Sequence, residues 1–479
     1  MKFEKHSISI YLFLILITSC DVLNPENSIP ENIEVGPNIT STRFFVSVDG
    51  DDSRTPQQAN NPLTPWKTIQ KAVDNISAGD TVLIGEGTYY EKVAITSSAS
   101  GTAVNPTLIR NVPGETVILD GKNEGTQWES LLKITGAEHI EVRGLKAING
   151  YWYGFSADET NNIKFDSLAT DNTRASGIYV RVTSFIEITN NNIRRACQAQ
   201  ERDEFGNGTQ ECITVGRTDN FKISHNEIWD VPLHGEGGEG IDAKGGCFDG
   251  EISHNYIHDI ERVGIYLDAG SHDQYNIRVF SNRVIDCGGG LSVAGELGGH
   301  IMDIYMYNNV LVNNTRSGVL FQNIMNGRFS NIYIVNNTLY NNGLVGFAGD
   351  VANFSQNELN ENLQIVNNVF YNKSENYRFS IFHNIAAPHV IHNNLYFDFK
   401  PGWAGGENNF TQANLTEADV QADPLFTNVQ SEDYTLQANS PAIGKGVPFK
   451  LPDGTLLFNT DYNGNTRGET AWDLGAFEN

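Results

Sequence analysis

Two short segments of this chain, EGIDAK and VGIYLD, gather charged side chains. In EGIDAK, Asp242 and Lys244 alternate with apolar residues, so in a β-strand both point to the same face. In VGIYLD, Tyr266 and Asp268 have the same spacing. Carboxylates beside a lysine and a tyrosine can hold a cation, move a proton or form a covalent intermediate. These two segments are therefore the first candidates for a functional site.

The two segments belong to a repeat that predicts an all-β solenoid. Copies of the segment begin at Glu211, Glu239, Val263, Gly289 and Ser317. A turn phrase with an asparagine recurs between the copies at separations of 25 to 35 residues. Its aligned asparagines are Asn191, Asn226, Asn255, Asn282, Asn309, Asn337, Asn368 and Asn393. Short alternating strands at this period are typical of stacked rungs, and we expect the asparagines to form a structural ladder of amides.

Alignment of the copies places chemically active residues in neighbouring columns of one face. The column that contains Lys244 runs Arg181, Gly216, Lys244, Asp268, Ala294 and Gln322, and the column beside it runs Tyr179, Thr214, Asp242, Tyr266, Ser292 and Leu320. Parallel strands stack about 4.8 Å apart, so neighbours in a column are within side-chain reach. We therefore expect one cluster that contains Glu211, Glu239, Asp242, Lys244, Tyr266 and Asp268.

The N-terminus has the features of a targeting segment. Lys2 and Lys5 precede a short apolar run, and ITSC ends at Cys20, which resembles the lipidated cysteine of a bacterial lipoprotein. An ordinary secretory signal with an incidental cysteine is the alternative. We expect five parts: residues 1–20 as a lipoprotein signal peptide, 21–42 as a flexible tether, 43–125 as the N-terminal cap and first rungs, 126–400 as the solenoid, and 401–479 as a C-terminal strand and loop cap.

One short amphipathic helix is expected at the N-terminal end of the solenoid. Apolar residues at helical spacing follow Thr64, which can cap the helix, and Pro65, which suits its first position. Such a helix covers the open end of a stack of rungs. The cysteines Cys197, Cys212, Cys247 and Cys287 share no CxxC spacing, so we expect buried thiols, with a disulfide as the alternative.

The overall charge excludes a class of partners. A formal net charge of −26 and a pI near 4.7 argue against nucleic-acid binding through a broad basic face. If the ligand is anionic, a local cation has to override the field of the whole protein.

The segment from FFVSVDGDDS to TYYEKV resembles the start of many secreted right-handed parallel β-helix proteins of the pectate-lyase-like superfamily. With the rungs, this resemblance covers about residues 44–400 and implies a right-handed parallel β-helix. EGIDAK is similar to the spacing between an acidic residue and lysine in β-helical uronate lyases of the chondroitinase B and alginate lyase type and in family-nine pectate lyases. This similarity implies Ca²⁺ at Glu211, Glu239 and Asp242, with Lys244 as the catalytic base. Chondroitinase-type enzymes carry arginine where this chain has Asp268.

Three interpretations of the cluster stay open. In a polysaccharide lyase, Ca²⁺ neutralises a uronate carboxylate and lowers the pKa of Lys244, which removes the C5 proton, and Tyr266 or Arg181 assists the leaving oxygen. In a glycoside hydrolase, two carboxylates among Glu239, Asp242 and Asp268 act together at a separation of about 5–9 Å. In a non-catalytic carbohydrate-binding protein, Lys244 forms only a surface ion pair.

Further residues on neighbouring loops are expected to bind substrate. These are Arg181, Arg217, His234, Glu296 and His300. The aromatic run from Tyr151 to Tyr153 is equally consistent with stacking on a sugar ring and with packing under a loop. The sequence thus predicts a lipid-anchored, extracytoplasmic and monomeric enzyme that acts on an acidic polysaccharide, on the periplasmic or the outer side of a bacterial outer membrane.

Overall fold

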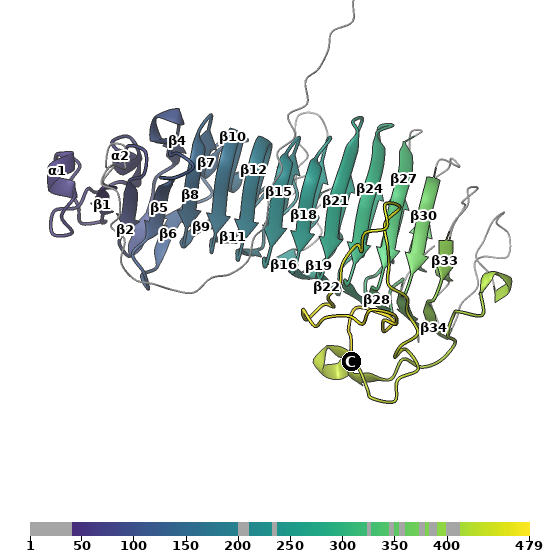
Figure 1. The fold of residues 1–479 in the computed structure, drawn as a ribbon. Helices are drawn as coiled ribbons and strands as arrows, with labels where there is room; N and C mark the ends of the chain where they lie inside the picture. The colour runs from purple at the N-terminus through teal and green to yellow at the C-terminus, as the bar shows by residue number, and fades with distance from the viewer. Residues whose placement is uncertain are drawn as a thin grey trace, which may run out of the picture. The chain divides into compact units, whose positions relative to one another are not determined.

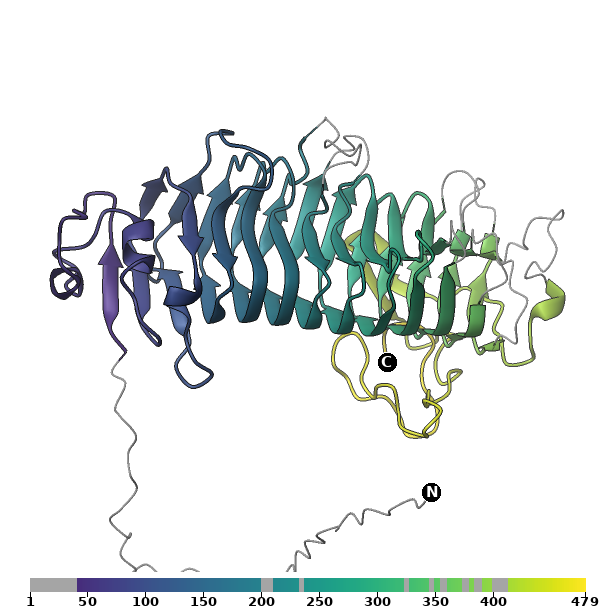
Figure 2. The same cartoon turned by 90° about the horizontal axis from the view of Figure 1, so that it is seen from above.

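The computed structural model describes residues 41–199, 210–231, 237–322, 327–343, 349–353, 360–372, 379–382, 390–398 and 412–479. The segment from Ser41 to the C-terminus forms one compact unit. Its strands pair in parallel, rung upon rung, as a right-handed parallel β-helix (Figures 1 and 2). The predicted fold class is therefore confirmed.

Two long sheets build the described rungs. In a sheet of 22 strands, the long strands β10 (Tyr153–Asp166) and β12 (Ile178–Thr189) pair at both ends with different neighbours and so divide the sheet into a front face and a middle face. The front face adds β4 (Val93–Ile95), β7 (Ser130–Thr135), β14 (Ile213–Gly216), β17 (Ile241–Lys244), β20 (Val263–Asp268), β23 (Gly289–Ala294), β26 (Ser317–Gln322), β29 (Gly349–Asn353) and β32 (Phe379–Phe382).

The middle face follows the front face along each rung. It adds β1 (Arg43–Val46), β2 (Thr81–Ile84), β5 (Thr107–Asn111), β8 (Glu138–Arg143), β15 (Asp219–Ser224), β18 (Phe248–Ser253), β21 (Gln274–Phe280), β24 (His300–Tyr307), β27 (Arg328–Val335), β30 (Asn360–Val366) and β33 (Val390–His392).

The back face is the second sheet, which has 12 strands. It contains β3 (Gly87–Tyr89), β6 (Val117–Asp120), β9 (Leu145–Ile148), β11 (Ala169–Asp171), β13 (Asn192–Arg194), β16 (Glu227–Val231), β19 (Tyr256–Ile260), β22 (Arg283–Ile285), β25 (Val310–Val312), β28 (Thr338–Tyr340), β31 (Val369–Tyr371) and β34 (Leu395–Phe397). Apolar residues at alternate positions of all three faces fill the interior, as Ile241, Ala243 and Ile265 do on the front face.

The asparagine ladder stands at the turn between the middle and back faces. Each side-chain amide donates to the Oδ1 of the next asparagine at 2.8–3.1 Å, from Asn191 onwards. The last member is Asn394, so the prediction of Asn393 was wrong by one residue. Asn393 has φ of 55°, a left-handed conformation that the residue before each ladder asparagine also adopts. The turn therefore uses two successive residues. The first adopts the left-handed backbone conformation, and the second contributes its side-chain amide to the ladder.

The helix at the N-terminal end begins later than expected. Helix α2 spans Ile69–Val73, and Thr68, not Thr64, caps it by accepting from the N–H of Lys71 at 3.2 Å. The reason is that Trp66 pairs as an extended residue with Val46 of β1. A second short helix, α1 (Pro56–Ala59), and the 3₁₀ turn η1 (Ser97–Ala99) complete the helical elements of this end. No helix among the described residues is long and apolar enough to cross a membrane.

The described part of the expected C-terminal cap, residues 412–479, contains the 3₁₀ turns η2 (Gln412–Asn414) and η3 (Val429–Ser431) and the hairpin of β35 (Phe426–Asn428) and β36 (Asp433–Leu436). Val420 extends the back face beside β34. The rest of the segment lies against the side of the later rungs.

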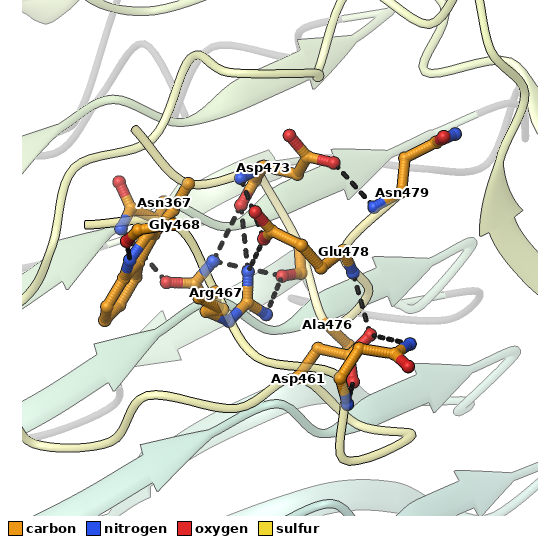
Figure 3. Close-up of polar contacts among 12 residues, drawn as sticks. Asn367, Asp461, Arg467, Gly468, Asp473, Ala476, Glu478 and Asn479 are labelled. Carbon is orange, nitrogen blue, oxygen red and sulfur yellow. Dashed lines mark hydrogen bonds and ion pairs between the residues drawn. The ribbon is translucent and has the colours of Figure 1, made fainter. Parts of the chain in front are cut away.

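A buried arginine holds this last segment. Arg467 donates to Glu478 Oε2 at 2.8 Å and to Asn308 Oδ1, on the β-helix, at 2.9 Å. Figure 3 shows its guanidinium enclosed by the C-terminal residues, with further bonds to the carbonyls of Asp473 and Gly475. A fully buried guanidinium needs several acceptors, and here it joins the C-terminus to the rungs.

The cysteines of the β-helix are buried thiols. Cys197, Cys212, Cys247 and Cys287 are all free, as the sequence predicted. Burial raises the pKa of Cys247 to about 12 and leaves that thiol protonated at neutral pH.

Candidate functional site

The strand register on the front face places the charged residues as the repeat predicted. Asp242 of β17 pairs with Thr214 on one side and Tyr266 on the other. In the next outward column, Lys244 pairs with Gly216 and Asp268. Both predicted columns are thus confirmed as neighbours in the sheet.

Lys244 is the centre of an ion-pair cluster. Its Nζ lies 2.5 Å from Glu211 Oε1 and 3.0 Å from Asp242 Oδ2. Both carboxylates are buried, whereas the lysine side chain is 31% exposed. Thr214 fixes the other oxygen of Glu211 by donating to Oε2 at 2.8 Å. The lysine side chain is therefore held on the outer surface of β17, partly exposed and paired with two carboxylates.

The environment of Lys244 keeps this side chain protonated. Burial alone lowers its pKa, but the carboxylates of Asp242 and Glu211 outweigh burial and raise the pKa well above its ordinary value. This direction is opposite to the lowered pKa that was expected for a base. Lys244 can remove a proton only after its own proton has moved to a neighbour.

Two aspartates of the cluster have raised pKa values. Burial, together with the charges of Glu211, Asp268 and Glu239, raises the pKa of Asp242 well above its ordinary value, although Lys244 opposes this effect. Among the described residues, no group donates a hydrogen bond to Asp242 Oδ1. Burial and Glu296 raise the pKa of Asp268 to about 6, against the N–H of Gly270, which donates to its Oδ1 at 2.8 Å. Asp268 can therefore carry a proton at slightly acid to neutral pH.

Tyr266 lies beside these aspartates with its hydroxyl oriented by a carboxylate. The hydroxyl donates to Glu296 Oε1 at 2.5 Å. Burial, and then the nearby negative charge of Glu296, raises the pKa of Tyr266. The phenol therefore keeps its proton and can supply it only to a stronger base, such as a leaving alkoxide.

The three carboxylates expected to bind calcium do not fit a metal site in this arrangement. Glu211 and Asp242 surround Lys244, while Glu239 pairs with Arg262 at 2.8 Å. Within the described ranges, no group of three or more histidine, cysteine, aspartate or glutamate side chains is arranged to hold a metal ion. Ca²⁺ needs six to eight oxygen ligands, and here the carboxylate oxygens already face two cationic side chains.

The other expected binding residues are spread along the rungs. Arg181, two rungs before Lys244, pairs with Asp158 at 3.1 Å. The backbone N–H of Arg217 donates to the carbonyl of Lys244 at 3.0 Å. His300 bonds Ser330 through Nε2 at 2.6 Å at the start of the middle face, and no described contact joins it to the cluster. His234 and Cys20 lie outside the described residues.

Sequence reasoning missed Arg262 and Trp128 on the front face. Arg262 precedes β20 directly, and only its ion pair with Glu239 of the preceding rung shows that it belongs to the cluster. Tyr153 stacks on Tyr179 with ring centroids 4.4 Å apart, and Trp128 packs over Tyr153 at 6.4 Å. Tyr153 and Trp152 are buried, so packing is the correct interpretation for these two rings.

Comparison with known proteins finds a family match for the first part of the β-helix. Residues 44–260 match a family described as the Pel9A-like, right handed beta helix region. This part of the chain is similar to that family. It includes Glu211, Glu239, Asp242 and Lys244, but ends before Tyr266. The resemblance seen in the sequence is thus confirmed.

Individual proteins that are similar to this chain include further pectate lyases of this type. Pectate lyase PEL9 of Emericella nidulans is 32% identical over 156 residues, which are 30% of this chain and 37% of that protein. The chain therefore matches little more than a third of the length of this relative. The crystal structure of pectate lyase Pel9A has a TM-score of 0.50 at 17% identity, over 92% of this chain and 97% of that one. The complex of XylC with xylose has a TM-score of 0.53 at 12% identity, over 91% and 98%. At these identities, the structures show the shared fold alone.

Proposed function

We propose that this protein is a polysaccharide lyase that cleaves a uronate-containing glycan by β-elimination on the front face. The observation that carries the proposal is the position of Lys244 on the outer surface of the front face, where its partly exposed side chain pairs with Glu211 and Asp242. The Pel9A-like region, which contains these three residues, and the pectate lyase name of a relative support the same reaction.

In the proposed reaction, Lys244 removes the C5 proton of the uronate. The C–H electrons form a double bond between C4 and C5, and the bond from C4 to the glycosidic oxygen breaks. Tyr266 donates its proton to that leaving oxygen and recovers one from water through Glu296. No metal takes part in these steps.

Asp242 is the group that lets Lys244 act as a base. Its Oδ2 lies 3.0 Å from Nζ, and its raised pKa makes it a ready proton acceptor from the ammonium. When the polysaccharide covers the front face and excludes water, a neutral pair of amine and carboxyl becomes favourable relative to the buried ion pair. The transfer of one proton from Nζ to Oδ2 then frees the lone pair of the lysine.

Substitution of Lys244 tests the proposal and the role of this residue together. We expect Lys244→Ala and Lys244→Arg to reduce the formation of UV-absorbing unsaturated ends from polygalacturonate or alginate by about 10²–10⁴-fold. Arginine keeps the charge but cannot lose its proton, so an active Lys244→Arg variant would show that Lys244 only binds the substrate. Lys222→Ala is the matched control, because Lys222 pairs with Glu251 at 3.3 Å on the middle face.

Glycoside hydrolysis is the second candidate, and the pKa of Asp268 near 6 favours it. A carboxyl that is still protonated near neutral pH is suited to donate a proton to a glycosidic oxygen. Saturated reducing ends that persist in Lys244→Ala but disappear in Asp268→Asn would support the hydrolase. Glycan binding without any product would refute both reactions and leave a carbohydrate-binding protein.

The location of the protein is part of the proposal. We propose that Cys20 is lipidated and anchors a monomeric, extracytoplasmic protein to a bacterial membrane, as the residues before it suggest. Incorporation of a labelled fatty acid into the wild type, and its loss in Cys20→Ala, is the expected result. Equal labelling of both proteins would contradict the anchor.

A further inference from the structure

Trp128 has an unusual backbone conformation for a large aromatic residue. Its φ is 69°, in the left-handed region, where bulky residues are outliers that cost free energy. The residue is also 44% exposed, two positions before β7 of the front face. Strain of this kind persists only where surrounding contacts enforce it, and it clusters at binding sites.

Buried aromatic rings fix the position of Trp128. Its ring lies 5.8 Å from Trp152 and 6.4 Å from Tyr153, both of which are 2% exposed. Tyr153 in turn stacks on Tyr179 with an interplanar angle of 10°. We call these four side chains the aromatic platform. Trp128 is its most exposed ring, and the rings below it leave it little freedom to turn aside.

The aromatic platform and the Lys244 cluster lie in the same columns of the front face. Tyr179 stands in the column of Asp242, two rungs earlier. Tyr153 lies two residues before the first residue of β10 that pairs with β12. Glu211 lies two residues before the corresponding residue of β14. From β7, which follows Trp128, to β17, which carries Lys244, the strand order passes four rung spacings, or about 19 Å. A polysaccharide that runs along the β-helix axis can touch both places at once.

We propose that Trp128 is a substrate-binding residue for a distal sugar of the uronate polysaccharide, several sugar units from the bond that is cleaved. The apolar C–H face of a pyranose ring packs on the exposed indole, while its hydroxyl groups stay in water. This inference rests on the proposed function, because it takes the chain bound at Lys244 to continue over the aromatic platform. Only substrates long enough to span these four rung spacings gain from this contact.

The length of the substrate is the variable that tests the inference. With oligogalacturonates or oligomannuronates, Trp128→Ala should raise KM for an octasaccharide roughly 3- to 10-fold and leave kcat unchanged. KM for a trisaccharide should not change, because a short substrate cannot reach Trp128 and Lys244 together. Trp128→Phe should keep most of the affinity for the octasaccharide. Tyr90→Ala is the matched control, since Tyr90 is 62% exposed but follows β3 of the back face.

Direct binding separates this inference from the proposed reaction. Calorimetry on Lys244→Ala, with and without Trp128→Phe or Trp128→Gln, measures octasaccharide affinity without cleavage. If the wild type cleaves neither oligosaccharide but Trp128→Gln weakens octasaccharide binding, the lyase fails and the Trp128 contact stands. If Trp128→Ala and Trp128→Gln leave octasaccharide binding and KM unchanged, or affect trisaccharide and octasaccharide equally, the distal contact is refuted.

Discussion

Asp268→Asn is expected to stabilise the folded protein at neutral pH. Burial and Glu296 raise the pKa of Asp268 from 3.8 to about 6, so ionisation of this carboxyl costs more free energy in the folded state than in the unfolded chain. This difference corresponds to about 3 kcal/mol of stability. Asparagine cannot ionise, and its side-chain oxygen can still accept the N–H of Gly270, which lies 2.8 Å from Oδ1.

The direction of the effect depends on pH in a defined way. Below about pH 4, the carboxyl is largely protonated in both the folded and the unfolded state, so its ionisation does not change the free energy of unfolding. Between about pH 4 and pH 6 the unfolded chain ionises first, so the free energy of unfolding of the wild type falls as pH rises, and above pH 6 the full loss remains. The gain from Asp268→Asn should therefore be near zero at pH 4 and reach about 3 kcal/mol at pH 7.5.

Urea unfolding of the wild type and Asp268→Asn at pH 4 and pH 7.5 measures this difference, because all unchanged groups cancel between the two proteins. Asp453→Asn is a control of opposite sign. Hydrogen bonds from Thr455 lower the pKa of Asp453, so that substitution should not stabilise the protein. An equal gain for Asp268→Asn at both pH values, or none at pH 7.5, would refute the reasoning.

Three further predictions concern other parts of the molecule. Arg467→Ala should lower the free energy of unfolding, measured in urea, by about 3–5 kcal/mol, because it removes a fully buried guanidinium and leaves Glu478 unpaired. The control Arg328→Ala, which removes an exposed ion pair, should lower it by about 1 kcal/mol or less. Asn282→Ala should cost about 1–3 kcal/mol in urea unfolding, because it interrupts the ladder on both sides. Cleavage of polygalacturonate or alginate should persist in chelator, because the front-face carboxylates are paired with cationic side chains. Activity lost in chelator and restored by calcium would contradict this last expectation.

The sequence predicts what the repeat itself determines. Each rung repeats the same backbone pattern, so the alignment was sufficient to place Lys244 next to Asp268. It could not decide between Asn393 and Asn394, because adjacent asparagines suit both the left-handed turn position and the ladder. The choice depends on the rung before, whose Asn368 donates to Asn394.

Contacts between distant segments were not predictable from the local pattern. Thr64 and Thr68 are both good helix caps, and the pairing of Trp66 with Val46 decides which one is used. The raised pKa of Lys244 likewise depends on Glu211, which comes 33 residues earlier and lies 2.5 Å away only after folding. Alignment gives the columns, but it does not give the side-chain partners that set protonation.

The charge of the front cluster itself makes a prediction about substrate binding. Acidic side chains outnumber basic ones among its described residues, which are Glu211, Glu239, Lys244, Asp242, Arg262, Asp268 and Glu296. A polyanionic substrate is repelled by this excess unless some of the carboxyls are neutral. Asp268, with a pKa of about 6, allows such neutralisation by a proton.

Binding of an oligouronate should therefore strengthen as pH falls through about 6, where Asp268 takes up its proton. The substrate carboxylates stay ionised down to much lower pH, so the gain comes from the protein. KM for an octasaccharide should be lower at pH 5.5 than at pH 7.5 in the wild type. The dependence should be reduced in Asp268→Asn, which is neutral at both values. A KM that does not change with pH, or one that falls as pH rises, would show that protonation of the cluster does not assist binding.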